Sequence, residues 1–99
     1  MKAMKLELTR ISLIDIDNDM DALRKAVGAD IEAVQTIGLA DGGVMIADER
    51  AMLKQYPHND LASYISSTHI YGTALIVGSD DSSDEFDDVP EQYYVWLGN

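Results

Sequence analysis

The chain has 99 residues, no cysteine and a formal net charge of −11 at pH 7, with 18 acidic residues against 7 basic ones. The absence of cysteine excludes disulfides, thiolate metal sites and thiol catalysis, and the negative charge disfavours direct binding to nucleic acid or anionic lipid. The length fits a single domain over residues 1–99, and neither a signal peptide nor a membrane span is recognisable, so we expect a cytoplasmic protein.

The charge is distributed unevenly along the chain. Residues 1–54 hold ten acidic and all seven basic residues, whereas residues 55–99 hold eight acidic residues and no basic one. The C-terminal half therefore produces a field of one sign, which attracts basic protein surfaces within a Debye length of about 8 Å at physiological salt.

The N-terminal residues 3–16 alternate between apolar and polar side chains. Met4 and Leu6 have one parity, whereas Ile11 and Leu13 have the other. This pattern predicts one or two strands, with a bulge or a tight turn where the phase changes.

The aspartate-rich segment 17–21 is typical of a helix start. Asn18 can cap the first turn, and acidic side chains are favourable near the positive end of a helix. Leu23 and Val27 then share an apolar face, and Gly28 suits the left-handed conformation that ends helices. A short helix is therefore expected here.

A hairpin is expected between residues 31 and 47. Apolar residues in segments 31–37 and 43–47 flank Asp41 and Gly42, a dipeptide that favours tight turns with positive φ. Two strands joined by this turn are therefore predicted.

The central part of the chain predicts a second helix and a buried strand. Asn59 can cap a helix over residues 60–66, whose apolar residues have helical spacing. Residues 72–78 are almost entirely apolar and bounded by glycines, which indicates a strand buried on both faces. Such a strand belongs in the middle of the sheet.

The C-terminal residues are expected to form a further short helix. Asp88 and Glu91 have the spacing of a capping box at its start. Helical spacing turns Tyr93 and Trp96 toward the core and leaves Tyr94 exposed. Together the elements predict an α+β fold, a small and mainly antiparallel sheet of four or five strands with two or three short helices.

Four stretches of the chain carry recognisable structural motifs, namely residues 27–34, 44–49, 56–62 and 70–78. They contain a glycine before a strand, an Asp-Glu turn and an Asn-x-x-Ala segment. In this order they resemble the family catalogued as domain of unknown function 3846, short proteins of bacteria, phages and conjugative elements. The resemblance implies a phage or mobile-element setting and no particular activity.

The acidic run 80–91 has the oxygen spacing of a calcium-binding EF-hand loop. Counting Asp80 as the first position, oxygen-bearing side chains fall at positions one, three, five, nine and twelve. An EF-hand requires glycine at the sixth position, where this chain has Glu85. The motif also needs a helix before the loop, whereas a strand is expected there. A solvated acidic loop is the plainer interpretation, and a calcium-responsive or metal-responsive module is kept as an alternative.

The same run supports a protein-binding hypothesis. The expected contact residues are Asp80, Asp81, Asp84, Glu85, Asp87, Asp88 and Glu91, with Tyr94 as an aromatic anchor. A further set, Asp15, Asp17, Asp19 and Asp21, contributes if it shares the same face. Duplex DNA carries one charge per about 1.7 Å of axis, so a protein that imitates it must display many uncompensated carboxylates.

We therefore expect a non-enzymatic accessory protein of a phage or mobile element that binds a basic host protein. In one version it imitates nucleic acid and occupies a DNA-binding defence enzyme; the plainer alternative is an uncharacterised domain whose acidic surface only keeps it soluble. The length leaves homo-oligomerisation open.

The remaining polar residues suggest no catalytic site. His58 and His69 are the only histidines, and no spacing to other ligands marks them as a metal site or an acid–base pair. No nucleophile elbow accompanies the serines near them, and no phosphate-binding glycine motif occurs. We expect no enzyme activity, no resident metal and no cofactor.

Overall fold

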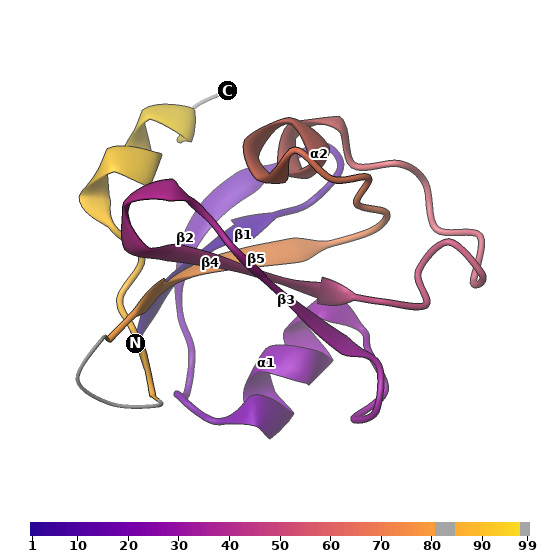
Figure 1. Cartoon of the computed structure of the whole chain (residues 1–99), viewed down its shortest axis with the longest axis horizontal. Helices are drawn as coiled ribbons and strands as arrows, with labels where there is room; N and C mark the ends of the chain where they lie inside the picture. The colour runs from indigo at the N-terminus through magenta and orange to yellow at the C-terminus, as the bar shows by residue number, and fades with distance from the viewer. Residues whose placement is uncertain (81–84, 98–99) are drawn as a thin grey trace.

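The strands form one antiparallel sheet in the computed structural model, which describes residues 1–80 and 85–97 (Figure 1). The strands lie in the order β2-β1-β5-β4-β3, and a short β6 pairs with the end of β5. Their bounds are β1 Lys2–Leu6, β2 Ile11–Asp15, β3 Val34–Gly38, β4 Gly43–Asp48, β5 Ala74–Ser79 and β6 Phe86–Asp87. The predicted α+β fold is confirmed, with β5 central as expected and β6 lying in a segment expected to be a loop.

Short helices cover both faces of the sheet. Figure 1 shows α1 on one face, and α2 and the C-terminal helix η2 on the other. Their bounds are α1 Met20–Val27 and α2 Asp60–Ser66, with the 3₁₀ helices η1 Ala40–Gly42 and η2 Glu91–Trp96. No helix in the described part of the chain is long and apolar enough to cross a membrane.

The predicted hairpin is present, and the N-terminal segment, expected to form one or two strands, forms a second one. The change of phase in the N-terminal segment is a tight turn, in which the amide of Glu7 donates to the carbonyl of Arg10 (2.9 Å). In the turn between β3 and β4, Asp41 and Gly42 have φ of 60° and 81°. Aspartate and glycine are among the residues that adopt this left-handed conformation most readily, which is why the dipeptide marks the turn.

The cap of α1 differs from the expectation by one residue. The carboxylate of Asp19 accepts from the amide of Ala22 (2.8 Å), whereas Asn18 donates its side-chain amide to the carbonyl of Phe86 (2.7 Å). Either residue type can cap a helix, so local sequence alone does not decide between neighbours. Gly28 ends the helix in the left-handed conformation, as expected.

The predicted cap of α2 is confirmed, and its side chain does more than cap. Asn59 is buried; its side-chain oxygen accepts from the amide of Ala62, and its side-chain nitrogen donates to the carbonyls of Leu6 (3.0 Å) and Gly72 (2.8 Å). One side chain thus joins α2 to the end of β1 and to the segment that leads into β5.

The predicted capping box at the C-terminal helix is wrong. The helix is a 3₁₀ helix that begins after Pro90, and no side chain caps it. Asp88 instead accepts from the backbone amide of Lys2 (2.7 Å), because this part of the chain continues along β1. Tyr93 is buried as predicted, and Tyr94 is half-buried against the core rather than exposed.

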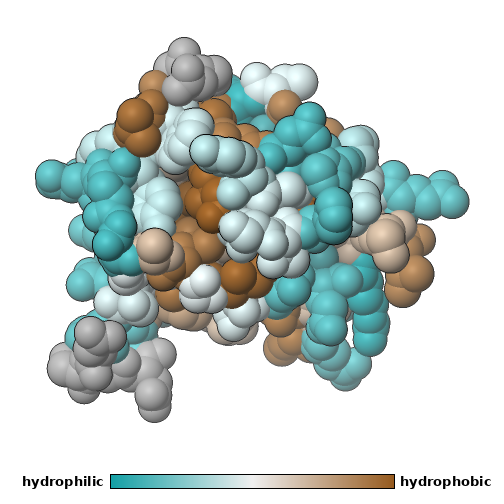
Figure 2. All heavy atoms as spheres, turned by 45° about the horizontal axis from the view of Figure 1, so that its top comes forward, coloured by the Kyte–Doolittle hydropathy of each residue, from teal (hydrophilic) through white to brown (hydrophobic). Residues whose placement is uncertain are grey.

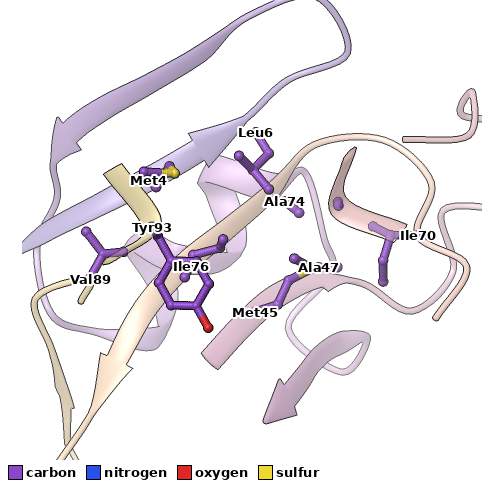
Figure 3. Packing of buried hydrophobic residues seen from close by; sticks show 10 residues of the cluster. Met4, Leu6, Met45, Ala47, Ile70, Ala74, Ile76, Val89 and Tyr93 are labelled. Atoms are coloured by element: carbon purple, nitrogen blue, oxygen red, sulfur yellow. The ribbon is translucent and has the colours of Figure 1, made fainter. Parts of the chain in front are cut away.

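Alternation along the strands separates two apolar layers. Leu75 and Val77 of β5 face α1, whereas Ala74 and Ile76 face α2 and η2. Figure 3 shows the second layer, in which the ring of Tyr93 lies close to Ile76. The hydroxyl of Tyr93 donates to the carbonyl of Ala40 (2.8 Å) and so joins η2 to the β3–β4 turn.

Candidate functional site

Four of the predicted contact residues, Asp80, Glu85, Asp87 and Asp88, lie at one end of the sheet, the end where β5 finishes and β4 begins. We call this region the acidic end. Its hydrogen bonds bring distant segments together, since Ser79 donates to the carbonyl of Gly42 (3.1 Å) and the Lys2 amide donates to Asp88. Its described carboxylates are those of Asp15, Asp17, Asp19, Asp41, Asp80, Glu85, Asp87 and Asp88.

The two acidic segments that are far apart in the sequence meet at this end. The hydrogen bond from Asn18 to the carbonyl of Phe86 places the segment before α1 beside β6. Asp15 lies directly across from Lys2 in the β1–β2 ladder, and Lys2 in turn contacts Asp88 through its amide. The sequence alone did not show whether the aspartates of segment 15–21 lie near the acidic run 80–91. Asp15, Asp17 and Asp19 do lie near its described part.

Asp21 is the member of the first set that does not contribute. Its carboxylate forms ion pairs with Arg24 (2.7 Å) and Lys25 (2.9 Å) on the surface of α1. Hydrogen bonds from Lys25 and then from Arg24 lower the pKa of Asp21. Its charge is compensated locally, so little of it remains for a partner.

Basic groups are scarce at the acidic end. Lys2 and the N-terminal amine, which donates to the carbonyl of Ile16 (3.1 Å), lie there. The other lysines and arginines lie along β1, in the β1–β2 turn, on α1 and beyond the end of β4. The acidic end therefore keeps a net negative charge.

The negative charge of the acidic end also affects Tyr93, which lies in the apolar layer beneath α2 and η2. Burial raises the pKa of Tyr93, and the negative charge of Asp41 raises it further. A nearby carboxylate opposes ionisation of a phenol, so the direction agrees with the arrangement of charges.

The remaining predicted residues are placed differently. Asp81 and Asp84 lie outside the described residues. Glu91 is exposed at the start of η2. Tyr94 packs partly against the core, so only part of its side chain is available to a partner.

The described part of the candidate calcium loop forms a different structure from an EF-hand. Phe86 and Asp87 pair with the end of β5, and the Asp88 carboxylate accepts from a backbone amide. A strand precedes the run and a 3₁₀ helix follows it, whereas the EF-hand places its loop between two α-helices.

The opposite end of the sheet holds a histidine pair that the sequence did not reveal. Nε2 of His58 lies 3.2 Å from Nδ1 of His69, and Nδ1 of His58 lies 2.6 Å from the carboxylate of Asp60. Ser63 places its hydroxyl 3.1 Å from Nε2 of His58. One imidazole, one carboxylate and one hydroxyl thus surround the ring of His58.

This histidine pair is held by the sheet and by α2. His58 forms an isolated antiparallel bridge with Tyr71, whose ring lies edge-on to the imidazole at 5.2 Å between centroids. Ser63 accepts from the amide of Ile70 (2.8 Å), which fixes α2 against the segment that carries His69. The eleven-residue separation of the histidines has no meaning as a ligand motif, and the bridge and the hydrogen bonds to Ile70 bring them together.

The histidine pair borders open surface rather than a closed cavity. It lines a pocket of about 330 Å³ with Tyr64 and Thr68, and a groove of about 620 Å³ between the β1–β2 turn and α2 begins beside it. On the side seen in Figure 2, hydrophobic surface is interleaved with hydrophilic surface. Small solutes therefore have access to both rings.

A family model described as domain of unknown function (DUF3846) matches residues 1–97. The chain belongs to the DUF3846 family. The resemblance inferred from the four motif stretches is therefore confirmed. No curated protein matches the DUF3846 chain.

One solved structure similar to the DUF3846 chain is the crystal structure of the small RNA methyltransferase HEN1. The two superimpose with a TM-score of 0.68 and 19% sequence identity over 89% of this chain. The match covers 14% of the HEN1 chain. At this identity the similarity supports the fold alone.

Proposed function

We propose that this DUF3846 protein is a non-enzymatic interaction protein that acts in the cytoplasm and binds a basic protein surface through its acidic end. The observation that carries the proposal is the Asn18–Phe86 hydrogen bond, which joins two acidic segments from opposite parts of the chain. Carboxylates held on a folded sheet end can match a fixed array of lysines and arginines better than a flexible tail can.

Imitation of nucleic acid is the more specific form of the proposal. A protein that binds DNA neutralises phosphates with Lys and Arg, and these side chains would also bind carboxylates held in the same positions. The phage and mobile-element setting implied by the family resemblance makes a DNA-binding defence enzyme a reasonable partner. The binding would then be competitive with duplex DNA and would weaken steeply as salt is raised.

Two matched triple variants test the proposal. Asp15→Asn, Asp17→Asn and Asp87→Asn together remove three charges from the acidic end and keep side-chain hydrogen-bond acceptors there. The control combines Asp30→Asn, Glu32→Gln and Glu49→Gln, which removes three charges near the opposite end, where the amide of Glu49 donates to Ala33.

Each protein is immobilised and exposed to bacterial lysate, and retained proteins are identified by mass spectrometry after elution with a salt gradient and, separately, with short duplex DNA. The expected result is a nucleic-acid-binding protein that the wild type and the control retain, that the acidic-end variant loses, and that DNA displaces. Equal retention by both variants would contradict a role for the acidic end. Retention that depends on the acidic end but resists DNA would keep the interaction and exclude imitation.

A further inference from the structure

The histidine pair carries an inference that is independent of the acidic end. We propose that His58 and His69 form a two-imidazole chelate for a divalent late transition-metal ion such as Zn²⁺. Imidazole nitrogen is a preferred ligand of zinc, nickel and copper, whereas calcium and magnesium prefer oxygen. The site would be selective for the first group.

The distance between the two nitrogens fits one metal ion. Zinc lies about 2.0–2.1 Å from histidine nitrogen. Two nitrogens 3.2 Å apart at that bond length subtend an angle of about 103° at the metal, close to the tetrahedral value of about 109°. The backbone bridge between His58 and Tyr71 fixes the main chain that carries one ring, and the contacts of that ring with Asp60 and Tyr71 orient it before any ion binds.

Asp60 determines which nitrogen of His58 is available. Its carboxylate oxygen lies 2.6 Å from Nδ1 of His58 and accepts a hydrogen bond from that nitrogen. With the proton on Nδ1, a neutral ring has its lone pair on Nε2, the atom that faces His69. Carboxylate–histidine–metal arrangements of this kind fix the tautomer and raise the basicity of the ligand. Asp60 is thus a positioning residue for the metal ligand.

The other neighbours accommodate an ion without competing for it. Without metal, Nε2 of His58 can accept from His69 or from the Ser63 hydroxyl. Ser63 can donate instead to the carbonyl of Ile70 (3.2 Å), so it keeps a partner when the metal takes the lone pair. His69 is exposed and can move its proton to Nε2 at little cost.

The site is an open one. Within residues 1–80 and 85–97, no group of three or more His, Asp or Glu side chains is arranged to hold a metal ion. Water, or a ligand carried by another molecule, would complete the coordination from the pocket that both rings line. We therefore expect reversible binding rather than a permanently held structural zinc.

The test is a calorimetric titration of the untagged, chelator-treated full chain with Zn²⁺ alone, with Ca²⁺ as a comparison. The proteins are the wild type, His58→Gln, His69→Gln and Asp60→Asn, with the acidic-end triple variant as the matched control. We expect one zinc ion per chain, at least tenfold weaker binding in each histidine variant, and about tenfold weaker binding in Asp60→Asn. The acidic-end variant should bind zinc as the wild type does.

NMR of the imidazole nitrogens supplies a second readout, and the backbone amide spectrum of the same samples shows that each variant is folded. Zinc should shift Nε2 of His58 and Nδ1 of His69 together. Undiminished zinc binding in either histidine variant, loss of zinc binding in the acidic-end variant, or a shift confined to one ring would overturn the chelate. Loss of zinc binding in the histidine variants does not bear on the binding of a basic partner at the acidic end, because these variants leave the acidic-end residues unchanged.

Discussion

Single side chains do much of the joining between elements in this small fold. Asn18, Asn59 and Tyr93 each connect segments that are far apart in the sequence through side-chain hydrogen bonds to backbone carbonyls. Among the described residues, no buried side-chain nitrogen or oxygen lacks a hydrogen-bond partner. A fold with so little interior depends on such polar connections as well as on its apolar layers.

Asn59→Ala should destabilise the protein by about 3 kcal/mol. The change removes a helix cap, worth about 1 kcal/mol, and leaves the buried carbonyls of Leu6 and Gly72 without their donor, at about 1–3 kcal/mol. Urea denaturation followed by circular dichroism measures the loss. The comparison is Asn18→Ala, whose exposed side chain makes one hydrogen bond to the Phe86 carbonyl and should cost about 1 kcal/mol or less. Similar losses in both variants would show that burial of Asn59 does not matter.

At the scale of elements, turns, helix caps and buried strands that depend on neighbouring residues could be predicted from the sequence. The Asp41–Gly42 turn, the Asn59 cap and the central position of β5 followed from backbone conformation and apolar pattern. β6 did not, because its two residues pair with the end of β5 in a polar, acidic stretch that has no strand pattern of its own. The capping-box prediction failed because the carboxylate of Asp88 accepts from the amide of Lys2, at the other end of the sequence, instead of capping η2.

Gly78 illustrates a residue whose role was visible only in three dimensions. The sequence pattern places it at a strand boundary, whereas it lies inside β5, opposite Gly43 and opposite Asp87. A Cβ atom there would collide with the backbone carbonyl of Asp88, which crosses this face of the sheet. Backbone atoms have little freedom to withdraw, so the glycine is required by close approach.

Gly78→Ala should therefore cost about 1–3 kcal/mol, the usual range for overpacking, and should detach the β6 segment. Gly38→Ala is the matched control, because a Cβ at this strand position meets no atom within 4 Å. Its effect should be near zero or slightly stabilising, since alanine restricts the unfolded chain. Thermal unfolding measures both variants, and amide hydrogen exchange at Phe86 and Asp87 reports the detachment. A neutral Gly78→Ala with protected β6 amides would refute the close-approach explanation.

For the whole molecule, the main feature is the separation of charge along the sheet. The sequence predicted an acidic C-terminal half, but only the packing of segment 15–19 against β6 gathers the charges from both halves at one end. β5 alone spans about 17 Å at about 3.3 Å per residue, roughly twice the Debye length in physiological salt. The acidic end and the histidine pair should therefore act independently of each other.

Added salt should stabilise the protein, because it screens repulsion among the carboxylates of the acidic end. The variant Asp15→Asn, Asp17→Asn and Asp87→Asn should be more stable than the wild type at low salt and should respond less to salt. The control at Asp30, Glu32 and Glu49 should keep most of the salt response, because the acidic end is unchanged in it and because Asp30 lies near Arg50 and interacts with Lys54. Urea unfolding at low and high sodium chloride measures the difference. Identical salt responses in the two variants would mean that net charge, and not its location, sets the stability.

The gathering of charge at one end also makes the molecule a strong permanent dipole whose axis follows the strands. In the field of a basic surface such a dipole experiences a torque, so the protein would rotate into a fixed orientation before it makes contact. A partner captured in this way always meets the same end of the molecule, and it leaves the pocket around the two imidazoles facing outward, where a second ligand can still reach it.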